Sequence, residues 1–495
     1  MVGAGFAGLG LAIRLRQAGV EDFVVLDRAD EVGGTWQANT YPGCQCDIPS
    51  HLYSFSFAPN PQWSRTYSLQ PEIWDYLRRL SDEHELGPHL RLGHELTGAA
   101  WEDDAQRWEI ETSGGDLTAQ VLVDATGGLS HPAAPRIRGL RRRFEGTVFH
   151  SARWDHEHDL DGERVAVIGT GASAIQFVPE IQPRVARLDV FQRTAPWVMP
   201  HSDRAITAAE RRLYRALPLA QRTVRAMVYW VREATLATAM TRDPRYLRQL
   251  ERVGRRHLRN QVPDPQLRRK LEPDFHLGCK RILISNRYYP TLTRDNVEVV
   301  TDRITEIRAR SIVTADGAER AVDTIILGTG FRVTDPPTAA LVRGRDGRTL
   351  ARRALDGDSV EAYLGTTIAG FPNLFRMTGP NTGLGHSSMV FMIESQLAYV
   401  MDALRVIDER GVSSFEVRPE VQAVYNEHLQ ARMPRTVWAS GCSSWYLDPD
   451  GKNVVLWPDF TFRYRHRLRR FDPRAYELRS RAVDSAPWEW VHQEG

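Results

Sequence analysis

Two glycine-rich strings, far apart in the chain, constrain its fold more than any other feature. The first, MVGAGFAGLGLAIRL, opens the sequence and sets Gly3, Gly5 and Gly8 in the spacing G-x-G-x-x-G ahead of a helical pattern. In that spacing the first glycine permits a tight turn, the second lets backbone approach a pyrophosphate, and the third packs helix against strand. The N-terminus of the helix attracts the phosphate charge. The string therefore predicts a dinucleotide site.

The strands beside this first string support the prediction and raise one conflict. FVVLD, residues 23–27, ends in Asp27, at the position where a carboxylate accepts hydrogen bonds from ribose hydroxyls. The strand that should precede Gly3 has only Met1 and Val2, whereas strands usually have about five or six residues. We therefore expect that the start codon was assigned too late, and that the sequence as written fills a central sheet position poorly.

The second string, RVAVIGTGASA, places Gly169, Gly171 and Ala174 behind a complete strand. Arg193, in DVFQRT, holds the position that Asp27 has after the first string. An acid at that position favours a free ribose hydroxyl, whereas an arginine favours a 2′-phosphate. We therefore predict FAD at the first site and NADPH at the second. The alternative for Arg193 is a solvated arginine at the end of a strand.

The fold class follows from a plan that occurs twice. Residues 108–127 and 310–330 each predict hairpin strands that lead into a Thr-Gly pair. A block at about 201–276 is rich in arginine, helical in pattern and without a glycine string. We predict an α/β fold with two Rossmann-like dinucleotide-binding domains and a helical insertion. The surface of the insertion is expected to be solvated and charged rather than an amphipathic membrane-contacting face.

Composition excludes several other classes of protein. A chain of 495 residues predicts two or three domains. Its 64 basic and 62 acidic residues do not call for nucleic acid, and the basic run RYRHRLRR (463–470) is expected to be a solvated face. We find neither a signal peptide nor an apolar run that could span a bilayer. Four cysteines are too few and too scattered for a disulfide framework, and Cys-x-Cys is not zinc spacing, so we expect no metal and a reducing, cytoplasmic location; they are Cys44, Cys46, Cys279 and Cys442.

Two further strings carry charged side chains. GGTWQANTYPGCQCD, residues 33–47, predicts a rigid loop with aromatic walls near the flavin and ends in Asp47. On these residues alone, Asp47 is either the partner of a buried cation or a loop cap. GCKRILISNRYYP, from residue 278, offers Lys280 and Arg281, for which surface ion pairs are the default interpretation.

The string FEGTVFHSARWD, residues 144–155, makes a family resemblance specific. The chain resembles class B flavoprotein monooxygenases of the Baeyer–Villiger type, most closely the branch around hydroxyacetophenone monooxygenase. The 33–47 string fills a second signature of that family, and the resemblance extends over nearly the whole chain, including 371–396 and 443–453. The 144–155 string fills every fixed position of the first signature, namely Phe144, Gly146, His150, Trp154 and Asp155.

The resemblance implies a division of the chain into domains. Residues 1–145 and 332–495 would form the FAD-binding domain, and 156–200 with 277–331 the NADP-binding domain, which contains the insertion 201–276. Residues 146–155 would connect the two domains. In this connector Gly146 is expected to supply backbone freedom, Trp154 an anchor, and His150 a hydrogen-bonding, positional role rather than a general base.

The resemblance also implies the chemistry. NADPH would reduce FAD, the reduced flavin would capture O2 as a C4a-peroxide, and the peroxide anion would attack a ketone to give an ester or lactone. Such an anion in a dry pocket needs a permanent positive charge beside it, for which arginine suits better than lysine. Arg281 matches the family's catalytic arginine, and Asp47 matches the acid that orients it.

The remaining site residues follow from the same resemblance. Lys280, Arg193 and Thr194 match the grip on the 2′-phosphate, and Trp445 falls in the loop that closes on the nicotinamide cofactor in relatives. The expected partners are a small ketone and O2, without nucleic acid or an integral membrane segment. Other cofactor-binding residues are Gly34, Thr35, Trp36, Asp47 and Tyr53 for FAD, and Ser173 for NADPH.

Three alternatives compete with this interpretation. A flavin-containing monooxygenase that oxidises nitrogen or sulfur would not need the Asp–Arg pair, and Trp154 with Asp155 disfavours it. A pyridine-nucleotide disulfide reductase would also stack two glycine strings, but it uses a Cys-x-x-x-x-Cys pair. A nucleotide-binding sensor, or a chain disabled at its N-terminus, would not turn over NADPH.

Overall fold

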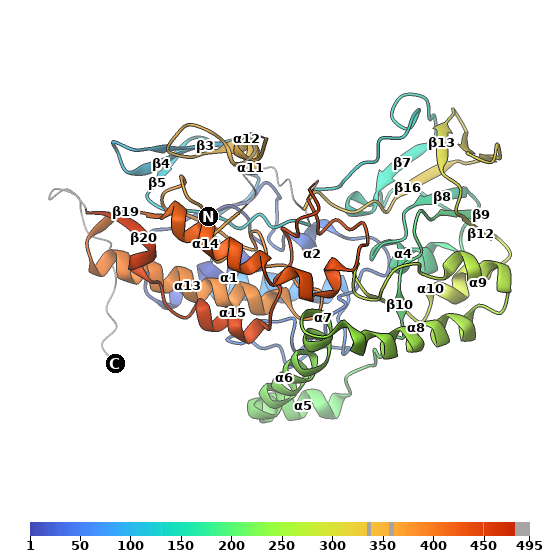
Figure 1. Ribbon diagram of the computed structural model, residues 1–495, viewed down its shortest axis with the longest axis horizontal. Helices are drawn as coiled ribbons and strands as arrows, with labels where there is room; N and C mark the ends of the chain where they lie inside the picture. The colour runs from blue at the N-terminus through green and yellow to red at the C-terminus, as the bar shows by residue number, and fades with distance from the viewer. Residues whose placement is uncertain (130, 334–337, 356–360, 449, 481–495) are drawn as a thin grey trace.

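The computed structural model describes residues 1–129, 131–333, 338–355, 361–448 and 450–480, so parts of the predicted block 332–495 lie outside the described residues. Each glycine string lies in a parallel sheet of its own, and the two sheets lie on opposite sides of the molecule (Figure 1). This arrangement confirms the predicted α/β class. Among the described residues, no helix is long and apolar enough to cross a membrane.

The first sheet contains the start of the chain at its centre. Strands β2 (Leu90–Arg91) and β1 (Val25–Leu26) pair in parallel, Val2 bridges β1 to β6 (Leu122–Asp124), and β6 pairs with β18 (Leu374–Arg376). Gly3 N donates to Leu26 O at 2.7 Å, and Ala125 N donates to Val2 O at 2.8 Å. The central position that was expected to be poorly filled is therefore bonded on both sides.

Helices and a second sheet enclose this first sheet. Helix α1 (Phe6–Gln17) packs against α13 (Met389–Glu409) and α3 (Gln70–Glu83). The predicted hairpin is confirmed in a four-stranded sheet with the order β17, β3, β4, β5. The other elements of this half are β17 (Val342–Arg343), β3 (Leu96–Glu102), β4 (Arg107–Thr112), β5 (Leu117–Ala119), β19 (Val412–Val417), β20 (Tyr476–Ser480), α2 (Thr35–Ala38), α11 (Thr338–Leu341), α12 (Leu350–Leu355), α14 (Pro419–Gln430) and α15 (Thr461–Arg467).

The second parallel sheet has the order β12, β9, β8, β16, β7. Its strands β8 (Arg164–Ile168) and β16 (Thr324–Leu327) are almost wholly buried, as their Val and Ile content predicts for a parallel sheet covered on both faces. The repeated hairpin plan is confirmed in β14 and β15. The other elements here are β12 (Val297–Val300), β9 (Arg187–Phe191), β7 (Thr147–His150), β10 (Val198–Met199), β11 (Leu283–Ile284), β13 (Ile304–Ile307), β14 (Ser311–Thr314), β15 (Glu319–Ala321), α4 (Ala174–Ile181) and α10 (Tyr288–Leu292).

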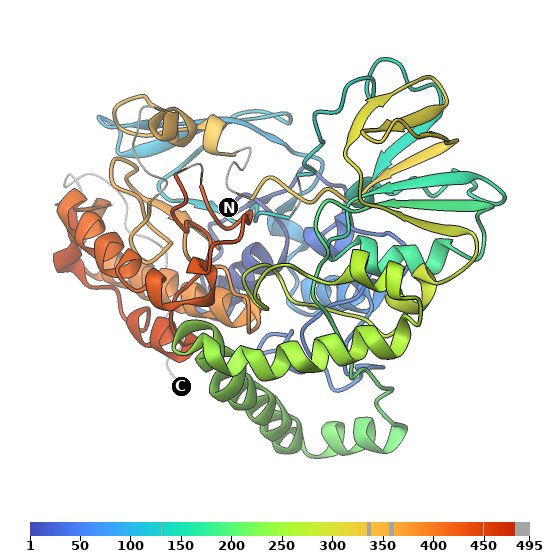
Figure 2. The ribbon, with the colours of Figure 1, turned by 45° about the vertical axis from the view of Figure 1, so that its right-hand side comes forward.

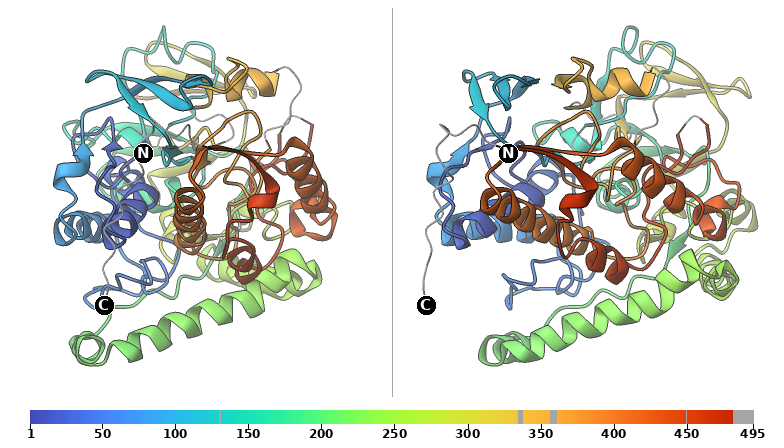
Figure 3. Two further views of the ribbon diagram at one scale, coloured as in Figure 1. Left: turned by 90° about the vertical axis from the view of Figure 1, so that its left-hand side faces the viewer. Right: turned by 60° about the vertical axis from the view of Figure 1, so that its left-hand side comes forward.

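The predicted helical insertion forms the lower edge of the molecule, drawn in green, in every view (Figures 2 and 3). The expected charged and solvated surface is wrong for one of its helices, α6. There Arg225 and Arg232 turn inward and donate to backbone carbonyls of Ser54 and His386, which leaves apolar side chains outside. The insertion consists of α5 (Ala208–Ala216), α6 (Pro218–Arg232), a π-helical turn (Glu233–Ala237), α7 (Thr238–Thr241), α8 (Leu247–Gln261) and α9 (Pro265–Leu271).

In both glycine strings the helix packs closely against a neighbouring strand, but the glycine of the contacting pair is on the helix in the first string and after the strand in the second. A Cβ on Gly8 would lie 1.9 Å from Gly3 O and 3.7 Å from the Cβ of Ala125 in the crossing strand. In the second domain the helix residue of the equivalent pair is Ala174, and the residue that it faces after the strand is Gly328. A Cβ on Gly328 would lie 3.3 Å from the Cβ of Ala174. One partner of each pair has to be small, which explains Gly328 in LGTGF.

Two alanine substitutions should separate packing glycines from open ones. Gly8→Ala places a methyl group against the backbone carbonyl of Gly3. We therefore expect the free energy of unfolding to fall by about 3 kcal/mol or more and the bound flavin to be lost. Gly171→Ala is the matched control, because nothing lies within 4 Å of a Cβ at that position. It should leave the thermal midpoint of unfolding unchanged and weaken only the binding of NADPH. Equal midpoints for the two variants would contradict the assignment.

The predicted connector 146–155 is partly a strand. Residues Thr147–His150 form β7 at the edge of the five-stranded sheet, paired with β16. A Cβ on Gly146 would lie 2.1 Å from Asp323 O, so close approach of the backbone, rather than freedom to bend, requires glycine there. The Trp154 ring packs 5.3 Å from that of Phe177 on α4, which anchors the segment on the second domain.

Candidate active site

An aspartate and an arginine from opposite halves of the chain meet between the two sheets. Nε of Arg281 donates to Oδ2 of Asp47 at 3.0 Å, and Nη2 donates to Oδ1 at 2.7 Å and to Oδ2 at 2.6 Å. Nη1 donates to the carbonyl of Leu384 at 3.0 Å. The carboxylate and the carbonyl together use all three guanidinium nitrogens, so the orientation of the cation is fixed.

The charge of this arginine is permanent in its setting. Asp47 raises the pKa of Arg281 well above its ordinary value, although burial acts in the opposite direction. Tyr446 lies close enough to interact with this charge, and burial raises the pKa of the Tyr446 hydroxyl to about 12. The arrangement therefore offers a fixed cation beside a neutral phenol. Such a site can stabilise an anion without transferring a proton.

The first glycine string forms a cradle made of backbone. A Cβ on Gly34 would lie 2.9 Å from the Cα of Gly5, so the loop at 33–36 touches the glycine turn directly. Asp27 holds this turn, because its Oδ2 accepts from Ala4 N at 2.7 Å and its Oδ1 from Ala29 N at 2.9 Å. These two hydrogen bonds were not predicted. They show that Asp27 stabilises the glycine turn, in addition to its expected role at a ribose.

The flavin loop is fixed by aromatic residues. Trp36 is buried, and its Nε1 donates to the hydroxyl of Tyr53 at 3.2 Å. Thr35 begins α2 directly after Gly34. No side chain of the described residues caps the first turn of α1, and that turn contains no acid, which suits its backbone N–H groups to bind a pyrophosphate.

The second site gathers two cations near the end of β9. Burial and the nearby charge of Arg193 lower the pKa of Lys280. Among the described residues, neither cation has an acidic partner within 4 Å, and the Lys280 ammonium lies 4.7 Å from the centre of the Phe275 ring. The carbonyl of Thr194 accepts from the Thr170 hydroxyl within the glycine string at 3.4 Å. Within the described part of the chain, helix α4, which begins after Ser173, likewise has no side-chain cap.

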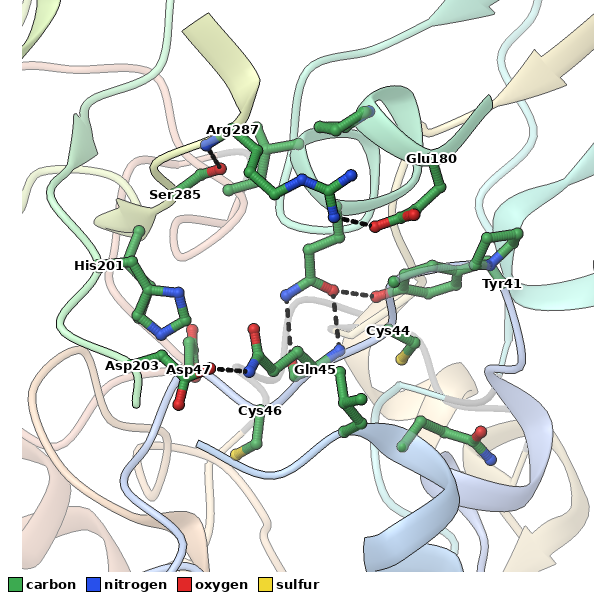
Figure 4. A pocket seen from close by; sticks show the side chains of 18 of the residues that line it. Tyr41, Cys44, Gln45, Cys46, Asp47, Glu180, His201, Asp203, Ser285 and Arg287 are labelled. Atoms are coloured by element: carbon green, nitrogen blue, oxygen red, sulfur yellow. Dashed lines mark hydrogen bonds and ion pairs between the residues drawn. The ribbon is translucent and has the colours of Figure 1, made fainter. Parts of the chain in front are cut away.

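A glutamine that the sequence did not single out joins the two domains. Gln176 on α4 accepts a hydrogen bond from the Tyr41 hydroxyl at 3.0 Å and donates to Gln45 O at 2.9 Å. Figure 4 labels Tyr41 and Gln45 and draws these bonds as dashed lines. The loop 40–47 and α4 form one side of a cavity of about 750 Å³, which reaches Asp47. Opposite them lie His201, Asp203 and 284–287. Only the Gln in GASAIQ could have suggested this contact.

The loop 384–388 contains a buried histidine that the sequence did not single out. His386 is fully buried, neither of its ring nitrogens makes a hydrogen bond in the described part of the chain, and burial lowers its pKa to about 3. Its Nε2 lies 3.7 Å from Oε1 of Glu233. It is two residues from the carbonyl that binds Arg281. Trp445, by contrast, is half exposed and contacts the adjacent Tyr446, with ring centres 4.4 Å apart. Among the described residues, neither a hydrogen bond nor a cation–π contact joins Trp445 to Lys280 or Arg193.

Comparison with known proteins places this geometry in a family. A Baeyer-Villiger monooxygenase of Streptomyces coelicolor is 52% identical over 480 residues, which cover 97% of this chain and 92% of that protein. A Baeyer-Villiger monooxygenase of Pseudomonas aeruginosa is 51% identical over 481 residues, covering 97% and 90%. The chain belongs to the Baeyer–Villiger monooxygenases. The predicted resemblance and enzyme class are thereby confirmed.

Solved structures agree with this Baeyer–Villiger assignment. Cyclohexanone monooxygenase from Rhodococcus, bound to NADP+, is 28% identical, with a TM-score of 0.86 over 97% of this chain and 98% of that one. A protein named OTEMO, in complex with FAD and NADP, is 27% identical with a TM-score of 0.84 over 96% and 98%. The two-domain fold predicted from the sequence is the fold of these enzymes.

A family model described as "Pyridine nucleotide-disulphide oxidoreductase" matches residues 1–217, which contain both glycine strings. Disulfide reductases need a reactive thiolate. In this Baeyer–Villiger monooxygenase Cys44 and Cys46 are buried, and burial raises the pKa of Cys44 to about 12 and that of Cys46 well above its ordinary value. The match therefore reflects the shared nucleotide-binding fold rather than thiol chemistry.

The expectation of reduced, unpaired cysteines is corrected at one pair. Cys279 and Cys442 form a disulfide, with their Cα atoms 6.2 Å apart and a sequence separation of 163. Proximity across such a distance cannot be inferred from spacing. The bond ties the segment of Lys280 and Arg281 to the loop of Trp445. The cytoplasmic location stays a prediction, and in that compartment this bond would be exposed to reductants.

The disulfide should contribute measurably to stability. Because it closes a loop of 163 residues, its reduction should lower the free energy of unfolding by about 2–4 kcal/mol. The measurement is urea unfolding with and without a dithiol reductant. Cys442→Ser is the control: it should match the reduced protein and not respond to the reductant. A reductant effect of equal size in both proteins would show that the bond contributes nothing.

Proposed function

We propose that this protein uses FAD and NADPH to insert one oxygen atom of O2 beside the carbonyl of a ketone, which gives an ester or a lactone. The bidentate pair of Arg281 and Asp47 is the observation that carries the proposal. A nucleophilic oxygen species needs an adjacent cation that cannot lose its proton, and Arg281 meets this requirement. Family membership supports the same reaction.

The bound flavin would supply the oxygen as a C4a-peroxide, and this chain's side chains would supply its surroundings. Arg281 would stabilise negative charge on the peroxide oxygen and on the oxygen of the attacked carbonyl. Asp47 and the carbonyl of Leu384 would hold the guanidinium in place during this change of charge. Burial of the loop at 384–388 would limit water near the anion.

The residues of both nucleotide sites fit the two cofactors. The uncapped first turns of α1 and α4, each behind a glycine turn, suit pyrophosphates. Asp27 at the first site suits ribose hydroxyls, and Arg193 with Lys280 at the second suits the 2′-phosphate of NADPH. The presence of FAD and NADP in related structures supports this assignment.

The direct test is identification of the product. The purified protein, supplied with NADPH and O2, would receive an aryl methyl ketone, a cyclic ketone and a thioether, and mass spectrometry would identify the products. An ester or lactone heavier than its ketone by one oxygen atom supports the proposal. Sulfoxide as the sole product would overturn it and would favour a heteroatom oxygenase instead.

A further inference from the structure

The outward face of α6 carries large apolar side chains that nothing in the described chain covers. Leu219 is 66% exposed, Met227 59%, and Trp230 and Val231 55% each. At 3.6 residues per turn, these four residues occupy about a third of the helix circumference. Phe462 on α15 extends the surface, with its ring centre 5.8 Å from that of Trp230. We refer to these five residues as the α6 patch.

The opposite face of α6 is held firmly, so the patch cannot turn inward. Nε2 of Gln221 donates to Asn60 O at 2.6 Å, and Nη1 of Arg225 donates to Ser54 O at 2.8 Å. The hydroxyl of Tyr229 bonds that of Thr461 at 3.0 Å. A contiguous apolar surface presented in a fixed position is typical of an interaction site.

The exposed ionisable side chains of α6 and α15 are all basic. Helices α6 and α15 contain no Asp or Glu. Arg222 is exposed at the edge of the patch, three residues after Leu219, and it has no ion pair among the described residues. Arg463 is exposed beside Phe462, where it also pairs with the buried Asp459 at 3.3 Å, and His466 is exposed on the same helix. Arg212 and Arg215 on α5 add to this rim, and the one carboxylate of α5, Glu210, is bound by Arg204.

We propose that the α6 patch docks on an anionic lipid surface. Trp230 and Phe462 would lie at the level of the head groups with the aliphatic residues beneath them, and the arginine rim would bind lipid phosphates. A second copy of this chain is the less favoured occupant, because its cationic rim would face an identical rim. The proposal depends on this surface alone and does not require the proposed reaction.

The position of α6 connects this surface with the candidate active site. Its last residue, Arg232, donates from Nε to the carbonyl of His386 at 2.9 Å. Two residues earlier in that loop, the carbonyl of Leu384 accepts from Arg281. Docking would thus place the lipid surface at the outer face of a helix whose end contacts the active-site loop.

The test is sedimentation of the flavin-loaded protein with vesicles of phosphatidylcholine, with and without phosphatidylglycerol. We expect binding only to the anionic vesicles, with a loss as salt rises from about 0.05 to 0.5 M. The double variant Trp230→Glu/Val231→Glu should lose at least about tenfold in affinity. The matched control is Val424→Glu on α14, since Val424 is also 50% exposed and lies outside the patch.

Each outcome decides between the occupants. Loss of binding in the double variant but not in the control supports the proposal, provided that flavin content and thermal midpoint are unchanged. Failure of the unaltered protein to bind anionic vesicles overturns it, and so does equal binding to neutral ones. A dimer that dissociates on Trp230→Glu/Val231→Glu, seen by analytical ultracentrifugation without lipid, would also overturn it and assign the patch to a second copy.

Discussion

Replacing Arg281 by alanine should abolish formation of the ester or lactone while NADPH oxidation continues. The guanidinium is the fixed cation that would stabilise the oxygen nucleophile, and no second cation contacts Asp47 among the described residues. Removal of one such preorganised charge typically costs a factor of about 100 to 1,000 in rate. The measurement is the ratio of product formed to NADPH consumed, which should fall toward zero as hydrogen peroxide is released instead.

Two further variants make this result specific. Arg281→Lys keeps the charge but cannot form the bidentate contact with Asp47, so we expect partial activity with poor coupling. Asp47→Ala leaves the cation without its orienting partner, and its rate should fall less than that of Arg281→Ala. Undiminished ester formation by Arg281→Ala would contradict the assigned role, and persisting sulfoxide formation in all three variants would not.

The parts of the fold that the sequence predicts are those specified by local signals. The glycine turns, the hairpins at 108–119 and 311–321 and the buried strands RVAVI and TIIL each depend on residues within one segment. The reason for an individual glycine is less accessible. Gly146 was expected to bend, whereas it is required by the carbonyl of Asp323, far along the chain. Such a contact exists only after the sheet has formed.

The candidate site was only partly accessible for the same reason. Asp47 and Arg281 are 234 residues apart. Taken alone, Asp47 could equally have been a loop cap, and Arg281 a member of a surface ion pair. Only the family resemblance joined them. Gln176, His386 and the Cys279–Cys442 bond had no such support and were missed. An apolar outward face in the insertion was considered and disfavoured, because PLAQRTVRAMVYWVR mixes arginine with apolar residues and the sequence does not say which set faces inward.

Removal of the cation pair at the second site should change the choice of nicotinamide cofactor. We expect Arg193→Ala/Lys280→Ala to raise the KM for NADPH by about 100-fold or more, because each of the two charge-assisted bonds to the 2′-phosphate contributes about 1.5–3 kcal/mol. The KM for NADH should hardly change. Arg184→Ala is the matched control, since its arginine pairs with Asp159 and Asp161 on the surface of the same domain. Parallel changes for both cofactors would contradict a phosphate site.

The lysine of this pair also predicts how pH acts on the cofactor. Burial and Arg193 lower the pKa of Lys280 in the free protein, so its ammonium form is lost earlier on raising the pH than that of an ordinary lysine. A bound 2′-phosphate favours the ammonium and raises the same pKa, so NADPH binding takes up a proton. The KM for NADPH should therefore rise as the pH passes upward through the lowered pKa, and the KM for NADH should not. In Lys280→Ala only Arg193 would remain to hold the phosphate, so the rise in KM should disappear. If Lys280 had a purely structural role, the rise would persist in this variant.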